Sequence, residues 1–181
     1  MASVEPIRDK EKINTVKRIL KQNGSRDYLL FLMGINSGLR ISDILKLKVK
    51  DVKDKEYIEL NEQKTNKYKK FPITNSFKYD LQEYIIGKML DECLFPSQKG
   101  GKSITRVQAY RIISKACVKA GIKARIGTHT LRKTFGYHFY QENKDIALLQ
   151  QIFNHSAPSI TLRYVGINQD IIDSRLNAFC L

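Results

Sequence analysis

Hydrophobic residues recur every three or four positions along most of this 181-residue chain, which is the period of an amphipathic α-helix. The segment 26–36 is apolar on all sides, so that helix should lie at the centre of the core. Gly24 and Gly38 should end the first two helices, and Ser103 is a candidate cap for a later one. Helices are predicted from Asp9 or Lys10 to Lys21, over residues 26–36, from Arg40 to about Leu45, and over residues 75–90 (with Phe77, Leu81, Ile85 and Met89 facing inward) and 104–120.

Between these helices the hydrophobic period changes from three or four to two, which is typical of β-strands. Val49 and Val52, residues 57–60 and residues 70–73 predict two or three short strands. The loop from Asn61 to Lys69 is polar and basic. The predicted fold class is therefore mainly α with a small antiparallel β-sheet, an α+β arrangement.

The charge of the chain narrows its possible partners more than its hydrophobic content does. Hydrophobic residues make up 42% and charged residues 28%, which is ordinary for a globular protein. Lys and Arg number 32 against 18 Asp and Glu, for a net charge of +14. This excess favours a polyanion, with nucleic acid first; an acidic membrane surface, an acidic protein or plain solubility are the alternatives.

Length and cysteine usage indicate one domain in a reducing compartment. We expect residues 1–8 to form a loose tail or the remnant of a linker, and residues 9–181 to form a single domain. An odd number of cysteines, three, without CxxC spacing predicts reduced thiols and a cytoplasmic location. The longest apolar run, residues 28–35, is too short to span a bilayer, so no membrane partner is expected.

The segment from His129 to Tyr164 carries the chemically informative residues. His129 and Arg132 are three positions apart and would share one face of a helix. His155 follows, and Tyr164 comes nine residues after it. Three short helices in series would bring these side chains around one point. Cations that hold phosphate oxygens beside a hydroxyl nucleophile suit the cleavage of a phosphodiester.

These motifs resemble those of the tyrosine recombinase (phage integrase) family. The segment 129–132 matches H-x-x-R, residues 155–156 match H-S, and the Tyr follows at the family's spacing. The first arginine motif of the family is matched by residues 37–45, and its hairpin lysine by Lys64 within residues 63–73. The resemblance extends from about Glu5 to the end of the chain.

The resemblance implies a site-specific DNA recombinase or integrase that needs no cofactor. Tyr164 would attack DNA and form a 3′-phosphotyrosyl link that conserves the bond energy, while Arg40 and Arg132 hold the phosphate. His129 would assist proton transfer or bind the scissile phosphate, and His155 would donate to a non-bridging oxygen. No metal is expected, since metal-ligand spacings are lacking.

Two assignments stay open at this point. Lys64 is the expected general acid for the leaving oxygen, with Lys67, Lys69 or Lys70 as rivals. Asp43 would either orient Arg40 or serve as a helix-terminal charge.

His138 is expected to be structural. Lys133 and Asn154 depart from the family's common His and Gly, and Asn tolerates the left-handed conformation. The expected DNA-binding residues are Lys67, Lys69, Lys70, Lys133 and Arg163.

The sequence also leads to expectations about the partners of this protein and about competing functions. The resemblance implies double-stranded DNA as substrate and self-association into a tetrameric synapse, with residues 169–181 forming a C-terminal helix that docks on a neighbouring protomer. The family's usual core-binding domain is not present in this sequence, so the chain is either a catalytic fragment or a naturally short member. Competing hypotheses are a type IB topoisomerase-like swivel, a non-catalytic DNA-binding module with the same fold, and a basic RNA-binding protein.

Overall fold

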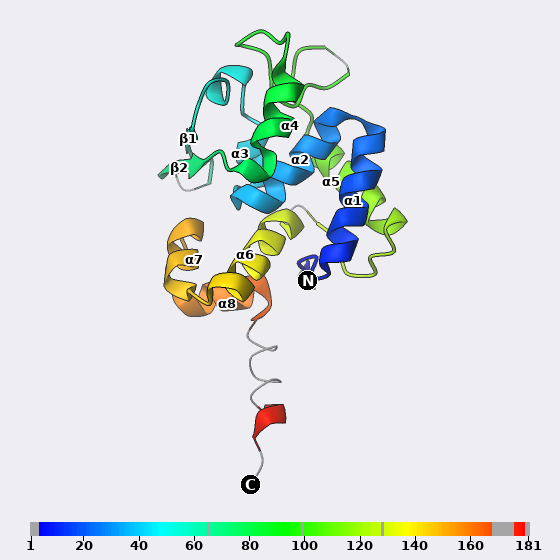
Figure 1. Cartoon of the computed structure of the whole chain (residues 1–181). Coiled ribbons are helices and arrows are strands. Elements are labelled where there is room, and N and C mark those ends of the chain that lie inside the picture. The colour runs from blue at the N-terminus through cyan, green and yellow to red at the C-terminus, as the bar shows by residue number, and fades with distance from the viewer. Residues whose placement is uncertain (1–3, 65, 99, 128, 168–175, 180–181) are drawn as a thin grey trace.

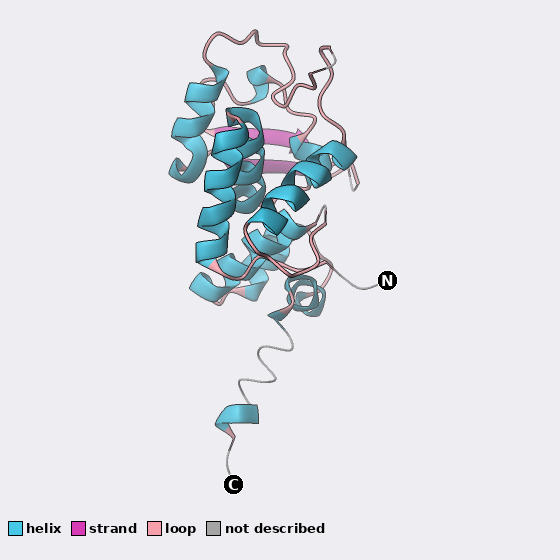
Figure 2. Ribbon diagram, turned by 90° about the vertical axis from the view of Figure 1, so that its right-hand side faces the viewer, coloured by secondary structure: helices cyan, strands magenta, loops and turns pink. Residues whose placement is uncertain are grey.

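The computed structural model describes residues 4–64, 66–98, 100–127, 129–167 and 176–179. The body is mainly helical, with one small sheet near its edge (Figures 1 and 2). This confirms the predicted fold class. The elements are α1 (Lys10–Asn23), α2 (Ser25–Ser37), α3 (Ile41–Ile44), the 3₁₀ helix η1 (Val49–Asp51), β1 (Tyr57–Asn61), β2 (Tyr68–Pro72), α4 (Asn75–Ile85), α5 (Arg106–Lys119), α6 (Thr130–Asn143), α7 (Ile146–Phe153) and α8 (Pro158–Val165).

Helix α2 forms the centre of the main core, as its sequence predicts. Residues 29–33 of this helix are each at most 2% exposed. Helix α1 packs beside it and is capped by Asp9, whose side chain accepts hydrogen bonds from the backbone N–H groups of the first turn. Gly38 ends α2 in the left-handed conformation. The chain therefore turns at this point and brings Arg40 to the start of α3.

The sheet is a single antiparallel hairpin. Ile58 on β1 lies opposite Phe71 on β2, and Asn61 lies opposite Tyr68 next to the loop. Side chains alternate across β1, with Ile58 and Leu60 turned toward the core. A strand predicted around Val49 is wrong: a 3₁₀ turn forms there, and the side chain of Asp51 accepts a hydrogen bond from the N–H of Lys48.

Helices α6, α7 and α8 pack together around a second, smaller apolar cluster below the hairpin (Figure 1). Its fully buried residues include Phe153 and Val165. Gly136 on α6 permits this packing, because a Cβ there would lie 2.5 Å from Cγ1 of Val165 and 2.8 Å from the Phe153 ring. The close approach holds α8 against α6.

Two helix ends differ from the prediction. Helix α4 ends at Ile85, and Gly87 follows with a positive φ of 75°. Met89, expected to face inward on a longer helix, is 71% exposed. Helix α5 is capped by Thr105 rather than Ser103, since the Thr105 hydroxyl accepts from the N–H of Gln108 and the side chain of Gln108 reciprocates.

The N-terminal segment packs on the body instead of forming a loose tail. Ile7 is buried, and its carbonyl oxygen lies 2.9 Å from Nε2 of His138. Arg8 donates to the carbonyl oxygen of Gly166 at the end of α8. His138 is therefore structural, as expected, while residues 1–3 lie outside the described part of the chain.

The predicted C-terminal helix lies mostly outside the described residues. Its described portion, 176–179, forms a helical turn with Leu176 and Phe179 exposed to solvent. Across the described ranges, no helix combines the length and the apolar character needed to cross a membrane.

Candidate active site

The structure gathers the predicted catalytic side chains from five segments. These segments are the start of α3, the hairpin loop, the start of α6, the turn after α7, and α8. They carry, in that order, Arg40, Lys64, His129 with Arg132, His155 and Tyr164.

The phenol of Tyr164 and the imidazole of His129 are in direct contact. The Tyr164 hydroxyl oxygen lies 3.1 Å from Nδ1 of His129, and the two rings meet edge to face. Burial raises the pKa of Tyr164, which the charges of Arg132 and Arg40 partly oppose. Burial lowers the pKa of His129, and Arg132 and Lys64 lower it further. A neutral imidazole at pH 7 can accept the phenol proton. His129 is the N-cap of α6, one residue before the helix that was expected to contain it.

Arg132 connects the ends of two helices. Its Nη1 donates to the carbonyl oxygen of Gly38 at 2.6 Å, and its Nη2 donates to that of Phe153 at 2.9 Å. Both carbonyls lie at helix C-terminal ends, where backbone acceptors lack partners and the macrodipole is negative. The guanidinium also lies 4.4 Å from the centre of the Phe153 ring. Burial lowers the pKa of Arg132 to about 10, so this side chain stays a cation at neutral pH.

A carboxylate that our sequence analysis overlooked lies within this cationic group. Glu62 has a fully buried side chain, and its Oε1 is 2.5 Å from Nη1 of Arg40, 3.4 Å from Nζ of Lys69 and 4.0 Å from Nη1 of Arg132. The signal was available in the strand alternation. Ile58, Leu60 and Glu62 occupy successive inward positions, so Glu62 is a charge where the pattern requires a buried side chain.

The hairpin lysines divide between the site and the surface. Lys69 points inward with Phe71, and its Nζ contacts Glu62 and the carbonyl oxygen of Ile152. Burial, followed by the charge of Arg132, lowers the pKa of Lys69 to about 8. Lys64 is exposed on the loop, where it lines a pocket of about 500 Å³ together with Arg40 and His129. Both lysines therefore lie at the site, and the geometry leaves two candidates for the general acid.

The lining of this pocket includes a residue that the motifs did not indicate. Arg106, at the first position of α5, lines the same pocket as Lys64. No sequence pattern linked it to the family motifs, because it lies outside all of them. Its guanidinium adds another positive charge to this pocket.

Asp43 anchors the hairpin loop. It is buried, and its Oδ1 accepts a hydrogen bond from the backbone N–H of Gln63 at 3.0 Å. We expected Asp43 to orient Arg40 or to serve as a helix-terminal charge. Asp43 lies in the first turn of α3, which fits the second expectation, and its hydrogen bond also ties α3 to the residue before Lys64.

His155 is held by the helix that carries the tyrosine. Its Nδ1 lies 3.0 Å from Oγ1 of Thr161, and its ring packs against that of Tyr164. Burial lowers the pKa of His155 to about 4, with further contributions from Arg132 and Arg40. The imidazole is thus neutral at pH 7. Asn154 adopts the left-handed conformation with φ of 51°, as predicted for the position before His155.

The predicted DNA-binding residues occupy different environments. Lys67 and Arg163 are exposed, whereas Lys133 is only 6% exposed and its ammonium lies 5.1 Å from the centre of the Tyr164 ring. Lys133 therefore lies beside the proposed nucleophile rather than on the outer surface, and its contact with DNA stays a prediction. Lys69 is also turned inward rather than toward solvent.

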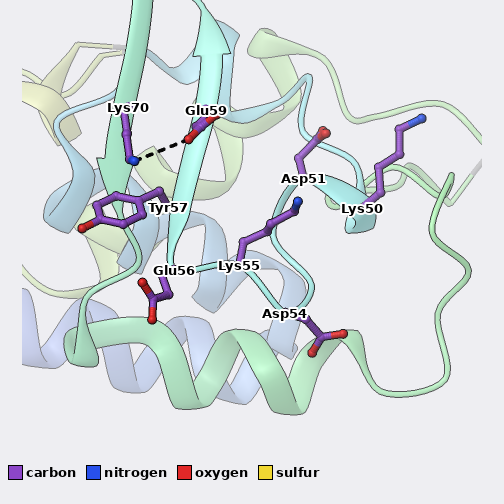
Figure 3. A pocket seen from close by; sticks show the side chains of 8 residues that line it. All are labelled: Lys50, Asp51, Asp54, Lys55, Glu56, Tyr57, Glu59 and Lys70. Carbon is purple, nitrogen blue, oxygen red and sulfur yellow. Dashed lines mark ion pairs between the residues drawn. The ribbon is translucent and has the colours of Figure 1, made fainter.

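Lys70 faces a separate hollow of about 630 Å³ on the outer side of the hairpin (Figure 3). There its ammonium lies 3.7 Å from Oε1 of Glu59 and 4.1 Å from the centre of the Tyr57 ring. Acidic and basic side chains line this hollow together, so it lacks the uniform positive charge of the catalytic pocket. We assign it no role in the chemistry.

Within the described ranges, no group of three or more His, Cys, Asp or Glu is arranged to hold a metal ion. Cys93 and Cys117 are free thiols, and burial raises the pKa of Cys117 to about 12.

Comparison with known proteins identifies relatives along nearly the whole chain. The model of the phage integrase family matches residues 8–170. A probable integrase/recombinase, YoeC of Bacillus subtilis, is 52% identical over 99% of this chain and 98% of its own length. The tyrosine recombinase XerH of Campylobacter jejuni is 29% identical over 83% of this chain but only 44% of its own length.

Solved structures agree on the fold. The crystal structure of XerA recombinase superposes with a TM-score of 0.78 at 21% identity, covering 98% of this chain and 65% of that one. XerH bound to a palindromic difH substrate, in a post-cleavage complex, gives a TM-score of 0.76 at 21% identity, covering 96% of this chain and 53% of that one.

Proposed function

The chain belongs to the phage integrase family, and on that premise we propose that it is a tyrosine-type site-specific DNA recombinase. It cleaves and rejoins DNA strands through a 3′-phosphotyrosyl intermediate. The observation that carries the assignment is the contact between Tyr164 and His129 at 3.1 Å, with two arginines converging on the same place. A hydroxyl nucleophile, a base within hydrogen-bond reach and cations for the phosphate are the parts that this reaction needs.

Cleavage begins with the transfer of a proton from the phenol. Nδ1 of neutral His129 accepts the proton as the Tyr164 oxygen attacks the DNA phosphorus. A bond forms between that oxygen and phosphorus, and the bond from phosphorus to the 5′-oxygen breaks. The leaving oxygen takes a proton from Lys64, the residue that matches the hairpin lysine of the family, with Lys69 as the alternative. Rejoining reverses each step with a 5′-hydroxyl of another strand.

The cationic cluster stabilises the charge that builds up on the phosphate. Guanidinium groups bind two oxygens at once and keep their charge, so Arg40 and Arg132 suit a pentavalent transition state. Arg132 uses two of its five N–H donors on backbone carbonyls, which fixes its position before DNA binds. This preorganisation reduces the rearrangement required at the moment of reaction.

His155 is proposed to donate a hydrogen bond to a non-bridging oxygen. The Thr161 hydroxyl can donate to Nδ1 or to the carbonyl oxygen of Ala157, 3.5 Å away. When it donates to Nδ1, the single proton of the neutral ring is on Nε2, which then becomes the donor. Thr161 is buried in the helix that carries Tyr164, so the donor and the nucleophile are positioned by one element.

The proposed substrate is double-stranded DNA, and the proposed assembly is a tetrameric synapse. We propose residues 9–181 as one catalytic domain, on which residues 4–8 pack, with residues 169–181 docking on a neighbouring protomer. This chain spans about half the length of several relatives, such as XerH, and nearly all of YoeC. The proposed location is the cytoplasm, where Cys93 and Cys117 would remain reduced.

A suicide DNA substrate tests this function. A nicked duplex that loses its short leaving strand traps the covalent protein–DNA adduct, which a denaturing gel separates from free protein. Wild-type protein should form the adduct and Tyr164→Phe should not, while Tyr79→Phe, on the exposed face of α4, serves as the matched control. DNA binding without an adduct in wild-type protein would instead support a non-catalytic DNA-binding module.

A further inference from the structure

A buried carboxylate lies at the centre of the catalytic cations and has no part in the chemistry described above. The side chain of Glu62 is 0% exposed, and three cationic side chains surround its Oε1. Nδ2 of Asn154, beside His155, approaches its other oxygen, Oε2, at 3.5 Å. The carboxylate thus contacts the arginine that begins α3, the arginine of α6, the hairpin and the turn after α7.

The backbone of Glu62 forms the base of the loop that carries Lys64. Its N–H donates to the carbonyl oxygen of Lys67 at 2.9 Å, and its own carbonyl oxygen accepts from the N–H of Asn66 at 2.8 Å. The next residue, Gln63, donates to Asp43. A displacement of Glu62 would therefore move the loop as well as the cations.

Electrostatics explains why a carboxylate is needed here. Arg40, Arg132 and Lys69 are close together and shielded from water, so their mutual repulsion is poorly screened. A single buried carboxylate offsets part of this repulsion while leaving a net positive cluster for a phosphate.

We propose that Glu62 is a positioning residue for DNA cleavage: its carboxylate holds Arg40, Arg132 and Lys69 in one cluster and sets the base of the Lys64 loop. This inference deepens the proposed function and rests on it. Glu62 acts through its neighbours and makes no contact with the reacting atoms in the mechanism.

The protonation of Lys69 gives the proposal a distinctive pH signature. The charged groups that face this ammonium are Arg132 and Arg40, which lower its pKa, and Glu62, which raises it. Replacing Glu62 by a neutral residue lowers the pKa of Lys69 further below about 8, so the site loses this charge at a lower pH.

Three variants separate positioning from general effects. Glu62→Gln keeps the shape and removes the charge, while Glu62→Asp keeps the charge and withdraws it by one methylene. Glu59→Gln is the matched control, because Glu59 lies three residues before Glu62, on β1, and also pairs with a hairpin lysine, Lys70, but its side chain is 53% exposed.

Adduct formation on the suicide substrate is the first measurement. At saturating DNA, we expect the rate for Glu62→Gln to fall by up to about a hundredfold, the cost of displacing catalytic groups by about 1 Å. Glu62→Asp should lie between Glu62→Gln and wild type, and Glu59→Gln should match wild type. The alkaline decline of the rate should begin at a lower pH in Glu62→Gln. Placed in a Tyr164→Phe background, the Gln substitution should leave DNA affinity unchanged or raise it, because the protein becomes more positive.

A second measurement needs no DNA and no catalysis. Inorganic phosphate should raise the melting temperature of Glu62→Gln by roughly twice as much as that of wild type or Glu59→Gln. The variant has no carboxylate competing with phosphate for Arg40, Arg132 and Lys69, and tighter binding to the folded state raises stability. Absence of an adduct in wild-type protein would refute the proposed function but leave this phosphate comparison to judge Glu62.

The positioning role would be wrong if Glu62→Gln cleaved DNA at the wild-type rate. It would also be wrong if phosphate stabilised all variants equally, or if the Gln and Asp variants lost activity only in proportion to their unfolded fraction. Should Glu62→Gln fail to fold, Glu62→Asp decides the question, because a folded Asp variant with the wild-type rate contradicts the proposal.

Discussion

The hydroxyl of Tyr164 and Nδ1 of His129 are separated by 3.1 Å, although the two residues are 35 positions apart in the sequence. The contact joins α8 to the N-cap of α6, beside the small apolar cluster against which Tyr164 packs. It places a proton acceptor at the nucleophile before any DNA is bound.

His129→Ala should slow adduct formation by about 10²- to 10⁴-fold, the usual contribution of a general base. The pKa of His129 lies below its ordinary value of 6.5. The imidazole therefore stays mostly neutral, and able to act as a base, at every pH above 6.5. Wild-type activity should therefore decline only below pH 6.5, and the variant should lack this acidic decline. Rates measured from pH 5 to 8 test both statements. His138→Gln is the matched control, since its ring contacts the Ile7 carbonyl away from the site.

Arg132→Ala should destabilise the fold as well as abolish cleavage. The substitution leaves the carbonyl oxygens of Gly38 and Phe153 without the donor that they share, and each such loss costs about 1–3 kcal/mol. Urea denaturation should show a decrease of about 2–5 kcal/mol in the free energy of unfolding. Arg163→Ala, which truncates an exposed arginine, should change this quantity by less than about 0.5 kcal/mol. An Arg132→Ala protein as stable as wild type would contradict the bridging role.

Removing the ring of His155 should reduce the acid sensitivity of the fold. The pKa of His155 is lowered in the folded state to about 4, below its ordinary value of 6.5. The unfolded chain therefore binds a proton first as the pH falls, and stability is lost between pH 6.5 and about 4. The ring is partly exposed, so after allowance for solvent screening we expect about 1 kcal/mol from this effect. Free energies of unfolding at pH 7 and pH 4.5 should differ less in His155→Gln than in wild type.

The two candidate general acids can be distinguished by the leaving group. A substrate with sulfur in place of the 5′-bridging oxygen releases a thiolate, which needs no proton because a thiol has a much lower pKa than an alcohol. Lys64→Ala should be severely slowed on normal DNA and recover on the sulfur substrate. Lys69→Met should be slowed on both substrates, because the Lys69 ammonium pairs with Glu62 and would stabilise the negative charge on the phosphate. Recovery by Lys69→Met instead would transfer the general-acid role to that residue.

Gly136→Ala should disturb the nucleophile from a distance. The added Cβ would lie 2.5 Å from Val165, the neighbour of Tyr164 in α8, and the overlap should cost about 1–3 kcal/mol in stability. Adduct formation should fall even when most molecules are folded, because α8 must shift. Val118→Ala, on the exposed face of α5, is the control for a substitution that changes neither property. An Ala variant with wild-type stability and rate would show that α8 accommodates the methyl group freely.

Local patterns in the chain were sufficient for much of this protein. The uniform hydrophobicity of residues 29–33 predicted the central helix, and Gly38 predicted its end. Asn154 predicted the left-handed turn before His155. Such features depend on steric preference and periodicity within a few residues, which a single sequence contains. The spacing of His129, Arg132, His155 and Tyr164 likewise indicated the family, because a fixed spacing on short helices constrains which side chains meet.

Packing between distant segments decided the rest. The alternation in β1 already marked Glu62 as inward, but its three cationic partners come from α3, β2 and α6, whose proximity no local pattern contains. Lys69 and Lys133 have the sequence character of surface residues, but Lys69 faces inward on β2 and Lys133 lies against the Tyr164 ring of α8. Ile7 belongs to the core because α6 lies beside it. Composition and spacing thus specified which chemical groups the protein has. Burial and long-range contact specified their protonation, their pairing and the direction in which each one points.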